Sequence, residues 1–232
     1  MKNESLAPAR REFLRKSTTA AAAISTLAAA PSRVFAAGNE RIRVGVIGCG
    51  NRGSGAAANC LEADPAVEIV AVADALPDRV TKFIESLADW AGKNSKPGER
   101  RVTVTKETTF IGFDAYRRLL AVAPLDVVIV TSPVAFHPLH LEACVKAGKH
   151  VFVEKAAAAD PVGCRRLIAA GELAKEKKLS VVAGTQRRHD PVYLENHKAV
   201  MDGAIGKILS GRVWWCGGNA RLQFERVEGE TD

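Results

Sequence analysis

Three glycines with the spacing G-x-G-x-x-G, Gly48, Gly50 and Gly53, directly follow the apolar, β-branched stretch Ile42–Ile47. A loop with this spacing of glycines can bind the pyrophosphate of a dinucleotide. The first glycine permits a tight turn, the second lets the backbone approach the phosphates, and the third allows the next helix to pack closely. A helix that begins at Asn51 would direct its N–H groups at the phosphates. Taken alone, the motif fits a structural turn equally well. Under the binding interpretation, the contacts come from Gly48, Cys49, Gly50, Asn51, Arg52 and Gly53.

An acidic residue further along favours dinucleotide binding over a structural turn. A second apolar stretch, Val67–Ala73, is followed by Asp74, which lies 21 residues after Gly53. At a spacing of roughly 20 residues, a carboxylate meets the adenosine ribose. A carboxylate also repels the 2′-phosphate of NADP, so Asp74 favours NAD, while Arg79 keeps NADP open as the alternative.

Strands and helices alternate along the chain as far as Ala183. Such alternation predicts an α/β fold with a doubly wound, parallel Rossmann sheet, in which ligands bind at the carboxyl ends of the strands. After the first two strands, we expect strands at residues 102–104, 125–130, 150–153 and 179–183. Helices are expected at residues 77–90, 113–120, 140–147 and 161–178, the last capped by Asp160 with Pro161 at its first position. The polar residues at the strand ends should face one crevice with the glycine loop. They are Asp74, Thr131, Ser132, His137, Glu154 and Lys155.

Lys155 is the predicted catalytic residue. Oxidation of an alcohol sends a hydride to the nicotinamide and releases a proton from the hydroxyl group. A lysine in an apolar crevice can have its pKa lowered and can exchange that proton with the substrate. The alternative is a surface lysine at the end of a strand. We also expect Lys155 to contact both cofactor and substrate.

These residues together resemble the glucose–fructose oxidoreductase / inositol dehydrogenase / rhizopine catabolism family. The resemblance rests on Val44–Gly53, Asp74, Thr131–Pro133 with His137, and Glu154–Lys155, and it extends to Gly184–Arg188, Asp202–Gly206 and Val213–Trp215. It implies an NAD(P)-dependent oxidoreductase of a sugar, polyol or related hydroxyl compound, with Lys155 in the proton-handling role. It also implies a second α/β domain with an open sheet, a possible surface for a homo-oligomer. In this family the Glu-Lys pair is usually followed by proline. Ala156 stands there instead, which removes one constraint on the backbone after Lys155.

Two other groups leave alternatives open. His137 either lines the nicotinamide side of the crevice or packs as a helix-start residue against Phe136. Arg187 and Arg188, with His189, either bind an anionic or hydroxylated substrate or form a solvated loop. We predict Arg187 and Arg188 as substrate-binding residues.

The expected domains are a Rossmann domain at residues 38–189 and a partial substrate domain at residues 190–232. In the second, residues 190–206 read as a linking helix and residues 207–216 as a strand. Family members are longer, and by resemblance they carry a D-x-x-x-H pattern whose histidine is the main acid/base, but no histidine follows His197 here. We therefore expect a C-terminally truncated chain, with exposed apolar surface around Trp214 and Trp215. Three functions stay open: the oxidoreductase, a glycosidase-like enzyme in which bound NAD oxidises the sugar transiently, and a non-catalytic dinucleotide-binding remnant.

Residues 1–37 have the layout of an export signal. Arg10-Arg11 precede Phe13-Leu14 and an Ala-rich run that Pro31 ends, and small residues near Ala37 could form a cleavage site. This layout resembles a twin-arginine signal and predicts a periplasmic protein that is folded before export. The alternative is an amphipathic or disordered N-terminal helix. The Ala-rich run is too short and too weakly apolar for a membrane span.

Charge and cysteine content argue against other classes of protein. The net charge is +7, but residues 1–37 carry six Lys/Arg and two acids, which leaves only +3 for the remainder. Such a small excess does not favour nucleic-acid binding. The five cysteines include no C-x-x-C and match no zinc spacing, so we expect neither a structural metal nor a disulfide framework.

Overall fold

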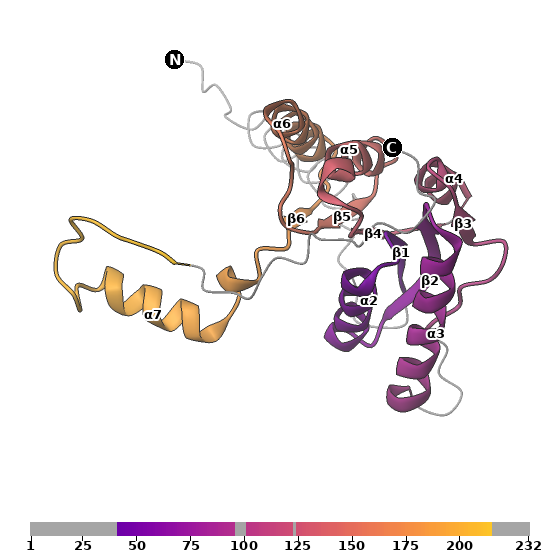
Figure 1. The fold of residues 1–232 in the computed structure, drawn as a ribbon, viewed down its shortest axis with the longest axis horizontal. Helices are drawn as coiled ribbons and strands as arrows, with labels where there is room; N and C mark the ends of the chain where they lie inside the picture. Colours follow the sequence, from indigo (N-terminus) through magenta and orange to yellow (C-terminus); the bar gives the residue numbers. More distant parts are fainter. Residues whose placement is uncertain (1–40, 96–100, 123, 215–232) are drawn as a thin grey trace, which may run out of the picture. The chain divides into compact units, whose positions relative to one another are not determined.

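The computed structural model describes residues 41–95, 101–122 and 124–214, so the predicted export signal at residues 1–37 lies outside the described residues. A parallel sheet of six strands, in the order β3-β2-β1-β4-β5-β6, forms the centre of the fold (Figure 1). This order is that of a Rossmann sheet, with the crevice at the point between β1 and β4 where the strand order reverses. The predicted fold class is therefore confirmed. The strands are β1 (Ile42–Ile47), β2 (Val67–Asp74), β3 (Thr109–Ile111), β4 (Val127–Val130), β5 (His150–Val153) and β6 (Val181–Ala183).

Helices cover both faces of the sheet (Figure 1). On one face, α2 (Asn51–Ala63) and α3 (Pro77–Asn94) bury an apolar cluster that includes Leu61 and Phe83. On the other face, α4 (Ala115–Val122), α5 (His137–Lys146) and α6 (Pro161–Glu176) bury a second cluster around Leu119 and Val145. Asp160 caps α6 as predicted, because its carboxylate accepts a hydrogen bond from Gly163 N at 2.8 Å. With both faces buried, the strands can be almost wholly apolar.

The third strand is not where the sequence pattern placed it. Of the predicted strand at residues 102–104, only Val102 pairs, through an isolated bridge to Ile69 of β2. A turn closed by Thr108, whose N–H donates to Thr105 O at 3.3 Å, then leads the chain back to the end of β2. There Thr109 pairs with Val72 and begins β3. The prediction of a strand at residues 102–104, made from their β-branched residues, is therefore wrong.

The contacts divide the chain into two compact units, with the division between Gly184 and Thr185. The described part of the second unit holds the 3₁₀ turn η2 (Gln186–Arg188) and the helix α7 (Pro191–Met201). Of the helix predicted at residues 190–206, Pro191–Met201 are helical, and residues 202–206 lie beyond its end. The strand predicted at residues 207–216 is absent from its described part, residues 207–214. A strand needs a partner for its backbone hydrogen bonds, and these residues pair with none of the described strands.

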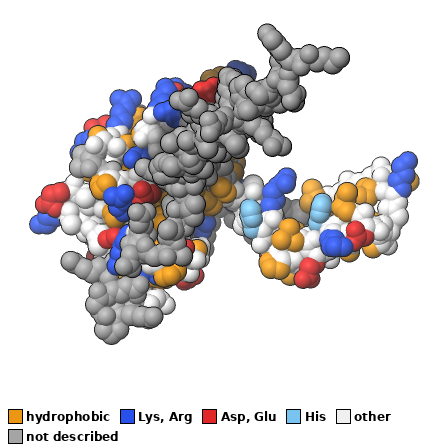
Figure 2. Space-filling view, turned by 180° about the vertical axis from the view of Figure 1, so that it is seen from behind, with side chains coloured by type: hydrophobic (Ala, Val, Ile, Leu, Met, Phe, Trp, Pro, Cys, Tyr) orange, Lys and Arg blue, Asp and Glu red, His pale blue; other side chains and the backbone are white. Residues whose placement is uncertain are grey.

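Apolar side chains are exposed in the second unit (Figure 2). Trp214 is 71% exposed, in agreement with the expectation of exposed apolar surface, while Trp215 lies outside the described residues. Within the described ranges, no helix combines the length and the apolar character that crossing a membrane requires.

Candidate dinucleotide and substrate site

The glycine turn after β1 is packed backbone against backbone. Gly48 has a φ of +101°, and an added Cβ would lie 2.4 Å from Ser132 N, so both the conformation and the space exclude a side chain. A Cβ on Gly53 would lie 2.1 Å from Gly48 O, which shows how closely the start of α2 packs on the turn. Thr131 fastens the same turn, because its Oγ1 donates to Gly48 O at 2.7 Å.

Gly50 differs from the other two motif glycines, since an added Cβ there meets no atom within 4 Å. It is the residue that precedes α2, and the helix begins at Asn51 as predicted. The first N–H groups of a helix lack partners within the helix and attract anions. The turn therefore leaves room where a phosphate would meet these groups.

Asp74, the last residue of β2, faces the glycine turn. Its Oδ2 accepts from Cys49 N at 2.6 Å, and its Oδ1 accepts from Leu76 N at 3.0 Å. Burial and the charge of Asp74 raise the pKa of the Cys49 thiol, so this thiol stays protonated. Cys49 thus contributes to the site through its backbone N–H, while its side chain is buried.

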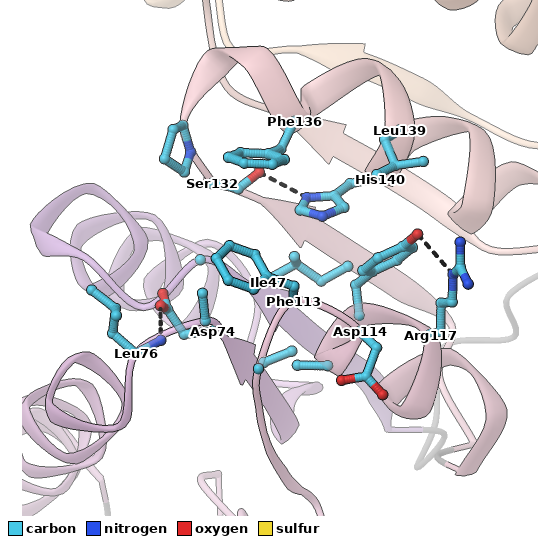
Figure 3. Close-up of a pocket in the computed structure, with 17 residues that line it drawn as sticks. Ile47, Asp74, Leu76, Phe113, Asp114, Arg117, Ser132, Phe136, Leu139 and His140 are labelled. Atoms are coloured by element: carbon cyan, nitrogen blue, oxygen red, sulfur yellow. Dashed lines mark hydrogen bonds between the residues drawn. The ribbon is translucent and has the colours of Figure 1, made fainter. Parts of the chain in front are cut away.

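A cavity of about 580 Å³ opens at the carboxyl ends of β1, β2, β3 and β4 (Figure 3). Phe113 lies across it, between Asp74 on one side and His140 on the other (Figure 3). Apolar and aromatic groups make most of the wall, with Asp74, Asp114, Arg117, Ser132 and His140 as polar groups. The lining is completed by Ile47, Gly48, Ala73, Ala75, Leu76, Gly112, Phe113, Ala115, Tyr116, Pro133, Phe136 and Leu139.

Sequence reasoning missed His140. Its Nδ1 lies 2.8 Å from Ser132 Oγ, and its ring packs 4.6 Å from Tyr116 and 6.0 Å from Phe136, centroid to centroid. Burial and the charge of nearby His137 lower the pKa of His140 to about 4, so the ring is neutral at pH 7. The available signal was its position three residues after His137, which places both rings on one side of a helix.

His137 is not one of the residues that line this cavity. The residue is 2% exposed, and both ring nitrogens are used: Nε2 lies 2.6 Å from Ser132 O, and Nδ1 lies 2.8 Å from Ala156 O. It is the first residue of α5, and its place on the nicotinamide side of the crevice stays a prediction.

The buried Glu154 side chain connects α2 to the end of β5. Its Oε1 accepts from Arg52 Nε at 2.6 Å, and its Oε2 accepts from the backbone N–H of Lys155 at 3.1 Å. Lys155 itself is exposed. The glycine turn, Thr131 and Glu154–Lys155 therefore follow β1, β4 and β5, three adjacent strands of the sheet.

The residues at these strand ends fit a bound dinucleotide. The packed turn supplies N–H groups beside open space at Gly50, and the carboxylate of Asp74 stands on the wall of a cavity large enough for an adenosine group. Within the described ranges, no cluster of three or more His, Cys, Asp or Glu side chains could hold a metal ion.

Comparison with known proteins identifies the family. Residues 42–185 match the family described as "Oxidoreductase family, NAD-binding Rossmann fold". The chain belongs to this family. Inositol 2-dehydrogenase 1 of Saccharopolyspora erythraea is 32% identical to it over 165 residues, which are 71% of this chain and 43% of that protein. A glycosyl hydrolase family 109 protein of Solibacter usitatus is 34% identical over 135 residues, 58% of this chain and 28% of that protein.

A solved structure also resembles this chain. The open conformation of KijD10, a 3-ketoreductase from Actinomadura kijaniata in complex with TDP-benzene and NADP, has a TM-score of 0.53 and 29% identity, over 72% of this chain and 46% of that one. The chain thus spans less than half the length of these relatives.

Arg187 and Arg188 lie in η2 and belong to the second unit, whereas the other predicted site residues of this oxidoreductase family member belong to the first. The Arg187 guanidinium lies 5.4 Å from the ring centroid of Tyr193 in α7. Both arginines are exposed, and their roles in substrate binding stay predictions.

Proposed function

We propose that this protein transfers a hydride between a nicotinamide dinucleotide and a hydroxyl carbon of a sugar, a polyol or a related compound. The observation that carries the proposal is the position of Asp74, which is hydrogen-bonded to the glycine turn and also forms part of the cavity wall. One residue thereby joins the two features that a dinucleotide needs, a phosphate-binding turn and a pocket for its adenosine half.

Different residues of the first unit would bind the phosphates, bind the ribose and transfer the proton. The N-terminus of α2 and the backbone of the glycine turn hold the phosphates, and Asp74 accepts hydrogen bonds from the ribose hydroxyls. When bound, the cofactor supplies the hydride acceptor or donor. Lys155 would take the proton from the reacting hydroxyl, or return it in the reverse direction, through its Nζ.

Substrate class and cofactor preference are inferred by analogy with the relatives. The inositol dehydrogenase bears the name of a polyol, and KijD10 is named a 3-ketoreductase. The carboxylate of Asp74 favours NAD as the cofactor, although the relative KijD10 was solved with NADP.

The similarity to a glycosyl hydrolase family 109 protein supports a second candidate. In this candidate, the sugar would be oxidised transiently by a tightly held NAD, the leaving group would be eliminated, water would add to the resulting double bond, and the hydride would then return to the sugar. Net reduction of NAD separates the two functions, because only the oxidoreductase consumes the cofactor.

We also propose export by the twin-arginine route and function in the periplasm, on the strength of Arg10-Arg11 and the run that follows. A homo-oligomer formed through the second unit would cover its exposed apolar side chains. Cell fractionation and sedimentation, respectively, measure these two properties.

The decisive test is titration of the purified chain with NADH and NADPH, followed by turnover with a panel of polyols and sugars. We expect NADH to bind more tightly than NADPH. Lys155→Ala should keep the NADH affinity within about threefold and lower turnover by about 10²-fold or more, because it removes only the proton-transfer group. Lys175→Ala, at the exposed end of α6, is the matched control. A wild-type chain that binds neither dinucleotide contradicts the proposal.

A further inference from the structure

The two residues that flank Lys155 are each hydrogen-bonded to a different helix. Glu154 is bound by Arg52, the second residue of α2, and Ala156 is bound by His137, the first residue of α5. These two helices pack on opposite faces of the sheet. The backbone of Lys155 is therefore held from both sides.

The contact on the Glu154 side is a charge-assisted hydrogen bond of 2.6 Å. The Glu154 side chain is only 8% exposed, so its charge depends on the Arg52 guanidinium for compensation. The other carboxylate oxygen accepts from Lys155 N at 3.1 Å. Glu154 thereby links the phosphate-binding helix directly to the backbone of Lys155.

The contact on the Ala156 side comes from a buried ring that bridges two loops. His137 Nδ1 reaches Ala156 O, and Nε2 reaches Ser132 O in the loop after β4, which forms part of the cavity wall. A ring N–H at either nitrogen can donate to the carbonyl oxygen beside it, and which nitrogen carries the proton depends on the tautomer. The ring thus sets the distance between the cavity loop and the segment after Lys155.

We propose that His137, together with the Arg52–Glu154 ion pair, positions Lys155 against the cofactor. This inference rests on the proposed function, because that function gives Lys155 its role beside the cofactor. The hydrogen bonds that hold the backbone of Lys155 do not depend on it. At Ala156, the hydrogen bond from the first residue of α5 holds the carbonyl group. Positioning matters because small displacements of a catalytic group cost large factors in rate.

The test separates the two hydrogen bonds of His137. In His137→Asn the amide nitrogen replaces Nδ1 and can still donate to Ala156 O, whereas in His137→Gln it replaces Nε2 and can donate only to Ser132 O. The readout is the backbone amide order parameter of Lys155 and Ala156 in the full chain, measured by ¹⁵N relaxation. We expect about 0.85 in the wild type and in His137→Asn, and about 0.6 or lower in His137→Gln.

Arg52→Gln tests the second contact. It should lower the order parameter of Lys155 in the same way, while Arg165→Gln, at an exposed position of α6, removes the same charge and should change nothing. Equal values in the asparagine and glutamine variants would overturn the proposal, whether both segments stayed rigid or both loosened. An unchanged value in Arg52→Gln would overturn the part played by the ion pair.

Titration of the same samples with NADH keeps this inference apart from the proposed function. A wild-type chain that binds no NADH, yet shows the expected pattern of order parameters, contradicts the function and supports the positioning. A chain that binds NADH without that pattern contradicts the positioning alone.

Discussion

At the scale of single residues, His140 makes the stability of the protein depend on pH. Its folded-state pKa of about 4 lies below the unfolded value of about 6.5. As the pH falls from 6.5 towards 4, the unfolded chain takes up a proton that the folded chain does not, so the folded state loses stability across this window, by up to roughly 3 kcal/mol.

His140→Asn removes the titrating group and places an amide group near the position of Nδ1, where it can still hydrogen-bond Ser132 Oγ. We expect the free energy of unfolding of this variant to change less than that of the wild type between pH 6.5 and 4, as measured by urea denaturation at several pH values. Parallel curves for the two proteins would show that His140 does not titrate in this window.

The residues that could be predicted are those whose spacing along the chain reflects a backbone requirement. Gly48, Gly53 and Asp74 belong to a turn whose geometry demands these residue types, and each occupies the expected place. His140 could not be predicted, because its role depends on Ser132 and Tyr116, which only the folded sheet brings to it.

At the scale of elements, the packing of α2 on the glycine turn should limit stability. Gly53→Ala places a methyl group 2.1 Å from Gly48 O, a backbone atom that cannot move aside. We expect a loss of about 3 kcal/mol or more in the free energy of unfolding, at the upper end for an overpacked site. Urea denaturation measures it.

Gly171→Ala is the matched control, because this glycine lies within α6 and an added Cβ meets no atom within 4 Å. There alanine should stabilise the protein by about 0.5 to 1 kcal/mol through its higher helix propensity. A similar change at both positions would mean that contact with the turn is not what restricts Gly53.

The boundaries of helices and strands could be predicted where the sequence marks them clearly. The helical spacing of apolar residues after Pro77 predicted the first residue of α3, and Asp160 followed by Pro161 predicted the first residue of α6. The third strand was misplaced because the pairing of β2 depends on a turn at Thr105–Thr108 and on only three residues of β3, a pattern too short to detect in sequence.

At the scale of the whole molecule, the two units should unfold independently. The first contains both apolar clusters, whereas the residues of α7 in the second are almost all exposed. Trp90 in α3 reports on the first unit, and the remaining tryptophans, Trp214 and Trp215, belong to the second. A variant in which Trp214 and Trp215 are replaced therefore reports only on the first unit. A variant in which Trp90 is replaced reports only on the second unit.

We expect NAD at 100 times its dissociation constant to raise the free energy of unfolding of the first unit, reported by Trp90, by about 2.7 kcal/mol. The unfolding of the second unit, reported by Trp214 and Trp215, should not change. Fluorescence-monitored urea denaturation of the two variants provides the measurement. Coincident transitions that shift together would show one cooperative structure.

Sequence reasoning reached the parallel sheet and the family but not the arrangement of the second unit. The sheet follows from repeated alternation of strand and helix, whereas residues 207–214 carry a strand-like composition and have no pairing partner among the described strands. Composition alone does not supply the partner that makes a strand.

The contact between Gly48 and the Ser132 backbone also bears on how the cavity could be engineered. Two main chains in direct contact form an inflexible wall, so no side chain there can be trimmed to widen the opening. The opposite wall is adjustable: Phe113 projects across the cavity, is 82% exposed and precedes the first residue of α4. Shortening Phe113 would admit bulkier synthetic cofactors while the wall beside Gly48 kept its shape.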